Sequence, residues 1–215
     1  MKETMTIHQA LVELKTLNVR INDMIRGATF VVANKHSNSK IGGMSVKDYA
    51  AEVRQTYQSV RTLINRRNAI KRAIVLSNAK TMVSIGGREY AVAEAIDMKT
   101  NGMGYYSVLQ AQIAKQLRDA KSTADRSNGD NLDDRADQYI HSLYANTELK
   151  NMSDEIKRMR EDFITAQTVE IVDPISAAEE AEKLRNYHDK FMSEIDAALS
   201  VSNALTTIEV EYETM

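Results

Sequence analysis

The 215-residue sequence contains no cysteine and no tryptophan, one proline at position 174 and only eight glycines. The lack of cysteine excludes disulfides and thiolate metal ligands. Few prolines and glycines favour long helices, because these two residues are the usual helix breakers. No apolar run approaches the roughly 20 residues that a membrane span needs, and the N-terminus lacks the apolar core of a signal peptide. We therefore expect a protein that is made and used in a cytosol.

The composition is that of an ordinary folded chain. Hydrophobic residues make up 43% and charged residues 27% of the sequence, which is enough apolar material for a core. The formal net charge is -2, so the chain as a whole has no basic field that would gather nucleic acid or anionic lipid.

Hydrophobic periodicity predicts a mainly α fold made of long helical hairpins or a bundle. Two capping boxes mark helix starts, T-x-x-Q at Thr6 and S-x-x-E at Ser176, and Ser45 with Asp48 marks a third. The predicted helices cover residues 6–27, 46–77, 93–99, 105–125, 132–166 and 177–202. A turn at 127–130 is interpreted as the corner of a helical hairpin.

A small antiparallel β element accompanies these helices. Two β-capable runs on either side of Gly86-Gly87 predict a hairpin over 81–92. Further short strands are expected near 29–33, 168–172 and 205–212, and a loop over 34–44. Because isolated strands are marginal in water, we expect them to pair into one small sheet or to add to the sheet of a partner. The predicted domains are an N-terminal helix, strand and loop over 1–44, a possible docking arm, and a helical core with a small sheet over 45–215.

Apolar residues alternate four and three apart along the first helix, which is the spacing of a coiled-coil seam. Asn18 is the polar member of this seam, and His188 lies in a similar stripe of the last helix. Two interpretations stay open, packing within one bundle or an oligomeric coiled coil. The first seam consists of Ile7, Leu11, Leu14, Asn18, Ile21 and Ile25, and a second one of Leu149, Met152, Ile156, Met159 and Phe163.

No motif in the sequence predicts a reaction site. The histidines at 8, 36, 141 and 188 are not at metal-ligand spacing, and neither Gly-Gly pair precedes a G-K-[ST] motif. Aspartates at 130, 133, 134 and 137 follow Gly129 in an order that a calcium loop does not have, so helix capping is the simpler interpretation. We predict no catalytic, cofactor-binding or metal-binding residues, and no enzyme.

Basic residues gather on the second predicted helix. They could track the phosphates of a nucleic acid over residues 54–72, or form ion pairs with acids of neighbouring helices. Aromatic side chains for base stacking do not interleave with them, which favours the second interpretation. These residues are Arg54, Arg61, Arg66, Arg67, Lys71 and Arg72.

Two segments of the sequence carry a resemblance to known proteins. One is Leu63-Ile64-Asn65 with the run from Arg88 to Ile96, and the other is the run from Ile195 to Ile208. Together they resemble the septicolysin-like family of small bacterial and phage helical proteins. The resemblance covers about 63–120 and 173–210, and the first 45 residues look like an addition. The family's name implies membrane activity, but this chain has neither an apolar nor a basic amphipathic helix to support it. The family supplies no catalytic residues, and its occurrence in phage genomes implies a virion component.

These observations lead us to expect a non-enzymatic structural or assembly protein. The expected setting is a bacteriophage virion assembled in the bacterial host cytoplasm. The chain would form a homo-oligomer or part of a larger particle, docking on neighbouring subunits through its helices and by strand addition. The alternatives are a nucleic-acid-binding helical protein that uses the basic stripe 54–72, and a toxin-like protein that interacts with lipid.

Overall fold

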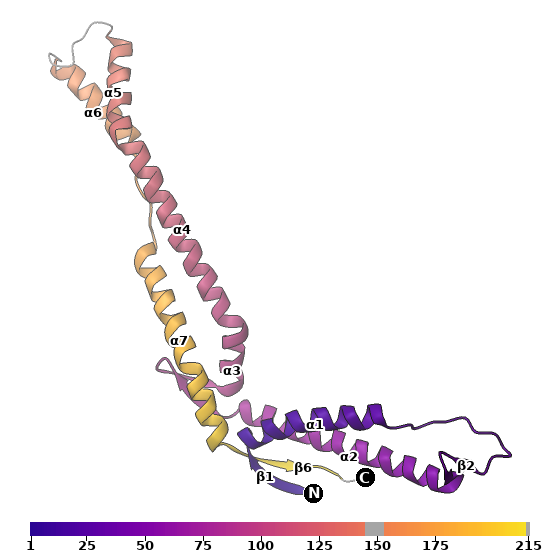
Figure 1. The fold of residues 1–215 in the computed structure, drawn as a ribbon. Helices are drawn as coiled ribbons and strands as arrows, with labels where there is room; N and C mark the ends of the chain where they lie inside the picture. Colours follow the sequence, from indigo (N-terminus) through magenta and orange to yellow (C-terminus); the bar gives the residue numbers. More distant parts are fainter. Residues whose placement is uncertain (145–152, 214–215) are drawn as a thin grey trace. The chain divides into compact units, whose positions relative to one another are not determined.

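The computed structural model describes residues 1–144 and 153–213 and confirms a mainly α fold with small antiparallel sheets of two strands each. The chain forms two compact units, which are shown in Figure 1. Unit 1 comprises residues 1–101 and 190–215, and unit 2 comprises residues 102–189. These boundaries differ from the expected division at residue 44, because the first helix packs into the core of unit 1.

Unit 1 is built around two helices that lie side by side, α1 (Ile7–Gly27) and α2 (Val46–Asn78) (Figure 1). The predicted capping box is present at α1: the Gln9 amide donates to Thr6 Oγ1 at 3.2 Å, and the Thr6 amide donates to Gln9 Oε1 at 2.9 Å. At α2 the Asp48 amide donates to Ser45 Oγ at 3.1 Å. These local bonds explain why both helix starts could be predicted.

The seam of α1 differs from the predicted one. Ala10 and Leu17 are buried, whereas Leu11, Asn18 and Ile25 are exposed. Both alternations share Ile7, Leu14 and Ile21, so periodicity alone did not decide between Leu11 and Ala10 or between Asn18 and Leu17. The buried stripe packs on a cluster that includes Ile70 and Ile74 of α2 together with Ile208, Val210 and Tyr212.

A two-stranded sheet covers this helix pair. Strand β1 (Lys2–Thr6), which was not predicted, pairs antiparallel with β6 (Thr207–Glu211), the strand expected near 205–212. Ile208 and Val210 point into the core, and the exposed Glu209 binds Lys2 Nζ at 2.8 Å. β1 depends on a partner strand some two hundred residues along the chain, which no local pattern contains.

The predicted hairpin over 81–92 is confirmed as β4 (Met82–Ile85) and β5 (Arg88–Ala91). Gly86 and Gly87 have φ values of 64° and 80°, the left-handed conformation that a tight turn of this kind requires. The expected loop 34–44 contains a further small hairpin, β2 (Lys40–Ile41) with β3 (Met44–Ser45). Helix α3 (Val92–Asp97) and a π-helical turn (Met98–Gly102) follow β5.

Two predicted strands are wrong. Residues 29–33 and 168–172 lie outside the strands and pair with no other strand of the described chain. Their β-branched residues give both segments a strand-like composition, but within the described ranges neither unit places a partner strand beside them. Val31 and Val172 are each 88% exposed as a result.

Unit 2 is helical. Its elements are α4 (Met103–Asn128), α5 (Asp130–Leu143), α6 (Asp154–Gln167) and the first part of α7 (Ala177–Leu205), which continues into unit 1. Apolar residues of α4, around Ile113 and Leu117, pack on Ala181 and Leu184 of α7.

The predicted continuous helix 132–166 is wrong, because α5 ends at Leu143 and α6 begins at Asp154 as a separate helix packed on α5. The helical corner therefore lies between α5 and α6, and not at 127–130, where α5 continues beyond the end of α4 (Figure 1). Leu149 and Met152 of the predicted second seam lie outside the described residues.

The start of α7 also differs from its predicted capping box. Ser176 adopts a φ of 54°, whereas an N-cap residue is normally extended. Both carboxylate oxygens of Asp173 instead accept the amide of Ala177, at 2.9 Å each. An aspartate four residues before the bonded amide thus takes the role that was expected of Ser176.

Candidate docking surfaces

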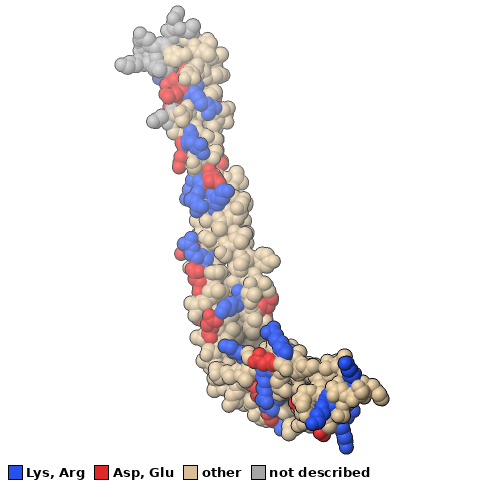
Figure 2. Space-filling view, turned by 45° about the vertical axis from the view of Figure 1, so that its right-hand side comes forward, with Lys and Arg blue, Asp and Glu red and all other residues tan. Residues whose placement is uncertain are grey.

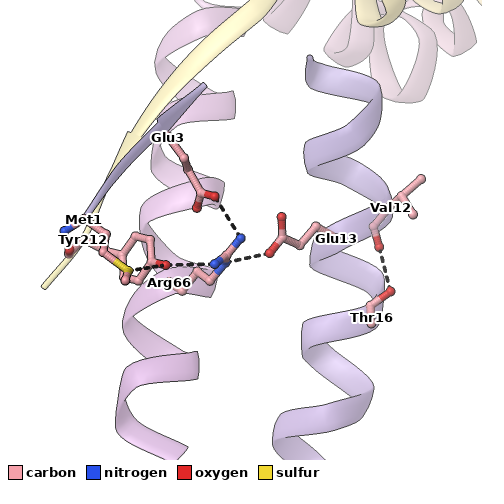
Figure 3. Close-up of polar contacts among 7 residues, drawn as sticks. All are labelled: Met1, Glu3, Val12, Glu13, Thr16, Arg66 and Tyr212. Atoms are coloured by element: carbon pink, nitrogen blue, oxygen red, sulfur yellow. Dashed lines mark hydrogen bonds and ion pairs between the residues drawn. The ribbon is translucent and has the colours of Figure 1, made fainter. Parts of the chain in front are cut away.

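The basic stripe of α2 is partly used inside unit 1. Arg66 Nε donates to Glu13 Oε1 on α1 at 2.6 Å, and its two terminal nitrogens donate to Glu3 Oε2 at 3.0 Å and to the Tyr212 hydroxyl at 2.8 Å. Figure 3 shows the guanidinium enclosed by these three groups. The hydrogen bond to Glu13 is the main cause that raises the pKa of Arg66 above its ordinary value. This is the interhelical ion pair that was one of the two interpretations.

Two of the other basic residues of the stripe contact side chains of unit 1. Arg67 Nε donates to the side chain of Asn18 at 3.2 Å, and the Arg61 guanidinium lies 5.8 Å from the centre of the Tyr57 ring. The remaining members, Arg54, Lys71 and Arg72, are exposed. Since Arg66 and Arg67 are engaged within unit 1, they are poorly placed to track phosphates. The nucleic-acid alternative stays a prediction.

The acidic segment at the start of α5 serves the α5–α6 hairpin. Arg160 of α6 donates to Asp137 through Nε and to Asp133 through a terminal nitrogen, both at 2.7 Å. These bonds raise the pKa of Arg160, with Asp137 as the larger cause. Tyr139 and Phe163 stack beside them with ring centres 4.7 Å apart. Helix capping alone, the interpretation from sequence, had missed this pairing with α6.

Within residues 1–144 and 153–213, no three acidic or histidine side chains come together as a group that could hold a metal ion. In the same ranges, no helix combines the length and the apolar character that crossing a membrane requires. His188 is partly buried and contacts Asp189 through Nδ1 at 2.9 Å. On the face of unit 2 drawn in Figure 2, basic and acidic side chains alternate along the surface.

The most distinctive surface of unit 1 is a groove between β4 and α7, with a volume of about 680 Å³. On the helix side it is lined by the small side chains of Ala197, Ala198 and Ser202. Met82, Val201 and Leu205 also line it and are 55%, 58% and 77% exposed. Small residues beside large exposed apolar ones leave room for an additional chain segment against the helix.

The free edge of β4 lines this groove. The Val92 amide donates to the Thr81 carbonyl at 2.9 Å, and the register pairs Met82 with Ala91 and Ser84 with Glu89. In an antiparallel ladder, hydrogen-bonded pairs alternate with pairs whose main-chain groups point outward. Met82 and Ser84 therefore direct their N–H and C=O groups away from β5. We call this edge with its groove the β4–α7 groove.

The hairpin is fixed to α7 at its turn. The Gly86 amide donates to Glu194 Oε2 at 2.6 Å, and the Tyr90 ring meets Phe191 edge to face at 5.5 Å. The opposite edge, on β5, differs, because Glu94 of α3 accepts the outward amide of Ala91 at 3.4 Å. The edge on β4, which lines the β4–α7 groove, is thus the more open of the two edges of the hairpin.

The two segments wrongly predicted as strands differ in how far their main-chain groups are already hydrogen-bonded. Asn128 holds Val169 as a strand partner would: its side chain donates to the Val169 carbonyl and accepts the Val169 amide, both at 2.7 Å. In the segment 29–33, Thr29 accepts a bond from the Tyr49 hydroxyl at 3.1 Å and Phe30 packs edge to face on Tyr57. The main chain around the exposed Val31 is therefore freer to pair with another strand than the main chain of Val169.

Comparison of the chain with family models, with curated proteins and with solved structures found no match in any of the three. The resemblance to the septicolysin-like family therefore stays untested, and the functional argument rests on the surfaces described above.

Proposed function

We propose that this chain is a non-enzymatic structural protein that joins neighbouring subunits of an assembly by strand addition. The observation that carries the proposal is the free edge of β4, where Met82 and Ser84 turn their main-chain groups toward a groove lined by small residues of α7. An added strand gains directional main-chain hydrogen bonds from such an edge, and its alternate side chains gain apolar contacts.

The dimensions of the groove define the occupant. β4 is four residues long, so the incoming segment needs a comparable extended stretch. Its side chains on the helix side would lie over Ala197, Ala198 and Val201, which suits β-branched or other apolar residues. Glu194 is already bound to the hairpin turn, so the groove offers an incoming segment few free charges.

Residues 29–33 of a neighbouring copy supply such a segment. The sequence Thr29-Phe30-Val31-Val32-Ala33 is rich in residues that favour strands. Val31 and Val32 are 88% and 44% exposed, which leaves apolar surface that strand addition would cover. The alternative segment 168–172 is a poorer donor, because Asn128 already occupies the main chain of Val169.

A peptide-binding experiment tests this proposal. The probe is a synthetic peptide of residues 28–34, titrated against the whole protein. Ser84→Pro removes the outward amide of β4, and proline is tolerated at strand edges. Glu89→Pro removes the outward amide of the paired residue on the opposite edge and is the matched control.

We expect the peptide to bind the wild-type protein and the Glu89→Pro variant, and to bind Ser84→Pro at least about tenfold more weakly, as the loss of one or two hydrogen bonds implies. No binding to the wild-type protein, or equal binding to all three proteins, would overturn the proposal. Circular dichroism of both variants checks that each remains folded.

We extend the proposal to a bacteriophage virion as the setting of this assembly. The support is the resemblance to a family that occurs in phage genomes, together with a surface suited to subunit docking. Mass spectrometry of purified particles tests it: the chain should be found in the particles at a fixed ratio to the other subunits. Its absence from them would refute the virion setting and leave the docking mechanism to the peptide experiment.

A further inference from the structure

A second apolar surface lies on the outer side of α1, opposite the buried stripe. Val12 and Val19, seven residues apart and therefore on one side of the helix, are 57% and 59% exposed. In Figure 3, Val12 and Thr16 lie on the side of α1 that faces away from Arg66. A helix that packs on one neighbour needs only one apolar stripe, so these two exposed valines on the opposite side leave apolar surface for a second partner.

The outer side of α1 also carries a shallow groove of about 490 Å³. Two rows of side chains spaced four residues apart border it, one with Lys15, Val19 and Asp23, the other with Thr16, Arg20 and Met24. Rows of this kind are the ridges that enter the grooves of a second helix in the commonest mode of helix packing. The groove therefore fits an α-helix.

The charges in the groove specify which helix. The charged residues that line it are Lys15, Arg20 and Asp23. Lys15 lies one turn before Val19 and Asp23 lies one turn after it, and neither forms an ion pair among the described residues. When two copies of α1 cross antiparallel at Val19, Lys15 of each copy faces Asp23 of the other. A parallel arrangement would instead place like charges opposite each other.

We infer that a second copy of this chain docks here, α1 against α1, antiparallel and with the two-fold axis near Val19. The surface is self-complementary, as a two-fold interface requires. Two ion pairs flank a contact between the two Val19 side chains. This interface uses neither the β4–α7 groove nor residues 29–33, so it stands or falls independently of the proposed strand addition.

Sedimentation equilibrium of the whole protein tests the inference, with strand addition blocked by Ser84→Pro. In this background we expect a mass twice the 24.2 kDa of the chain. Adding Val19→Glu should give the monomer mass. The matched control is Val75→Glu, which places the same charge at a valine of α2 that is 52% exposed, and it should leave the dimer intact.

Charge reversal tests the orientation. Lys15→Asp should weaken the dimer by about tenfold or more, because two attractive pairs become repulsive. The double variant Lys15→Asp with Asp23→Lys should restore the wild-type dissociation constant. Ser84→Pro, which blocks strand addition, should leave this dimer unchanged.

A monomeric wild-type protein, or a dimer that survives Val19→Glu, would overturn the inference. A dimer that is lost with Val19→Glu but not restored by the double charge reversal would overturn the antiparallel arrangement. A dimer that is lost only with Ser84→Pro would assign self-association to the β4–α7 groove and also contradict the inference.

Discussion

Arg66 and Glu13 join the two long helices of unit 1, with the Arg66 Nε 2.6 Å from the Glu13 Oε1. Both side chains are less than a third exposed, at 27% and 28%. The same guanidinium binds Glu3 on β1 and the hydroxyl of Tyr212, which follows β6. One cation thus holds together the helix pair and the sheet that links the two ends of the described chain.

Replacing Arg66 should therefore destabilise unit 1. We expect Arg66→Met to lower the free energy of unfolding by about 2 kcal/mol, because it leaves the carboxylates of Glu3 and Glu13 without their partner. Arg54→Met, at an exposed position of the same helix, should change it by less than about 0.5 kcal/mol. Urea unfolding followed by circular dichroism measures both values, and equal effects would contradict the role assigned to Arg66.

The pKa of Arg66 predicts how this effect depends on pH. A folded-state pKa raised by Glu13 gives a contribution that is fully present below the unfolded-state pKa and is lost only as the pH rises through the folded one. Both values lie far above the neutral pH range. The loss caused by Arg66→Met should accordingly be the same at about pH 7 and at about pH 9. A loss that shrinks markedly over this range would show that another group titrates in the cluster.

The turn of the β4–β5 hairpin should be sensitive to a side chain. Gly87 has a φ of 80°, and we expect Gly87→Ala to cost about 1–2 kcal/mol through steric strain. Gly104 lies within α4, where a Cβ would meet no atom within 4 Å. Gly104→Ala should therefore be neutral or stabilising by about 0.5–1 kcal/mol. Thermal unfolding of the two variants compares them, and a Gly87→Ala protein as stable as the wild type would contradict the turn conformation.

In unit 2, the two aspartates that bind Arg160 should contribute unequally to the stability of the α5–α6 hairpin. The side chain of Asp137 is 31% exposed and that of Asp133 is 65% exposed. Exposed ion pairs contribute little, so Asp137→Asn should accelerate amide exchange in α6 more than Asp133→Asn does. Hydrogen exchange of residues 154–167 measures the difference. The reverse order would show that burial does not decide the strength of these pairs.

The elements that could be predicted from the sequence are those with local causes. Thr6 with Gln9 and Ser45 with Asp48 cap their own helices, and Gly86-Gly87 closes its own hairpin. The strand β1 and the exact seam of α1 could not be predicted, because they depend on partners far along the chain. Residues 29–33 show the same limit: their composition favours a strand, but no strand of the described residues lies beside them.

The candidate docking surface could be predicted only in part, because it combines features with local causes and features that depend on residues far along the chain. The hairpin and the idea of strand addition follow from Gly86-Gly87 and from the short strands in the sequence. The role of Ala197, Ala198 and Ser202 does not, because these residues line a groove only once the hairpin lies against a helix more than one hundred residues later. The Arg66 cluster was foreseen as a possible ion pair, although its partners Glu3 and Tyr212 were not.

Amide exchange at Met82 and Ser84 tests strand addition most directly. Measured by NMR in the isolated protein and in the protein saturated with the peptide of residues 28–34, both amides should pass from rapid exchange to strong protection. The Glu89 amide, on the opposite edge of the hairpin, should exchange at the same rate in both samples and serves as the internal control. Exchange at Met82 and Ser84 that stays equally rapid with and without the peptide would contradict the proposed function.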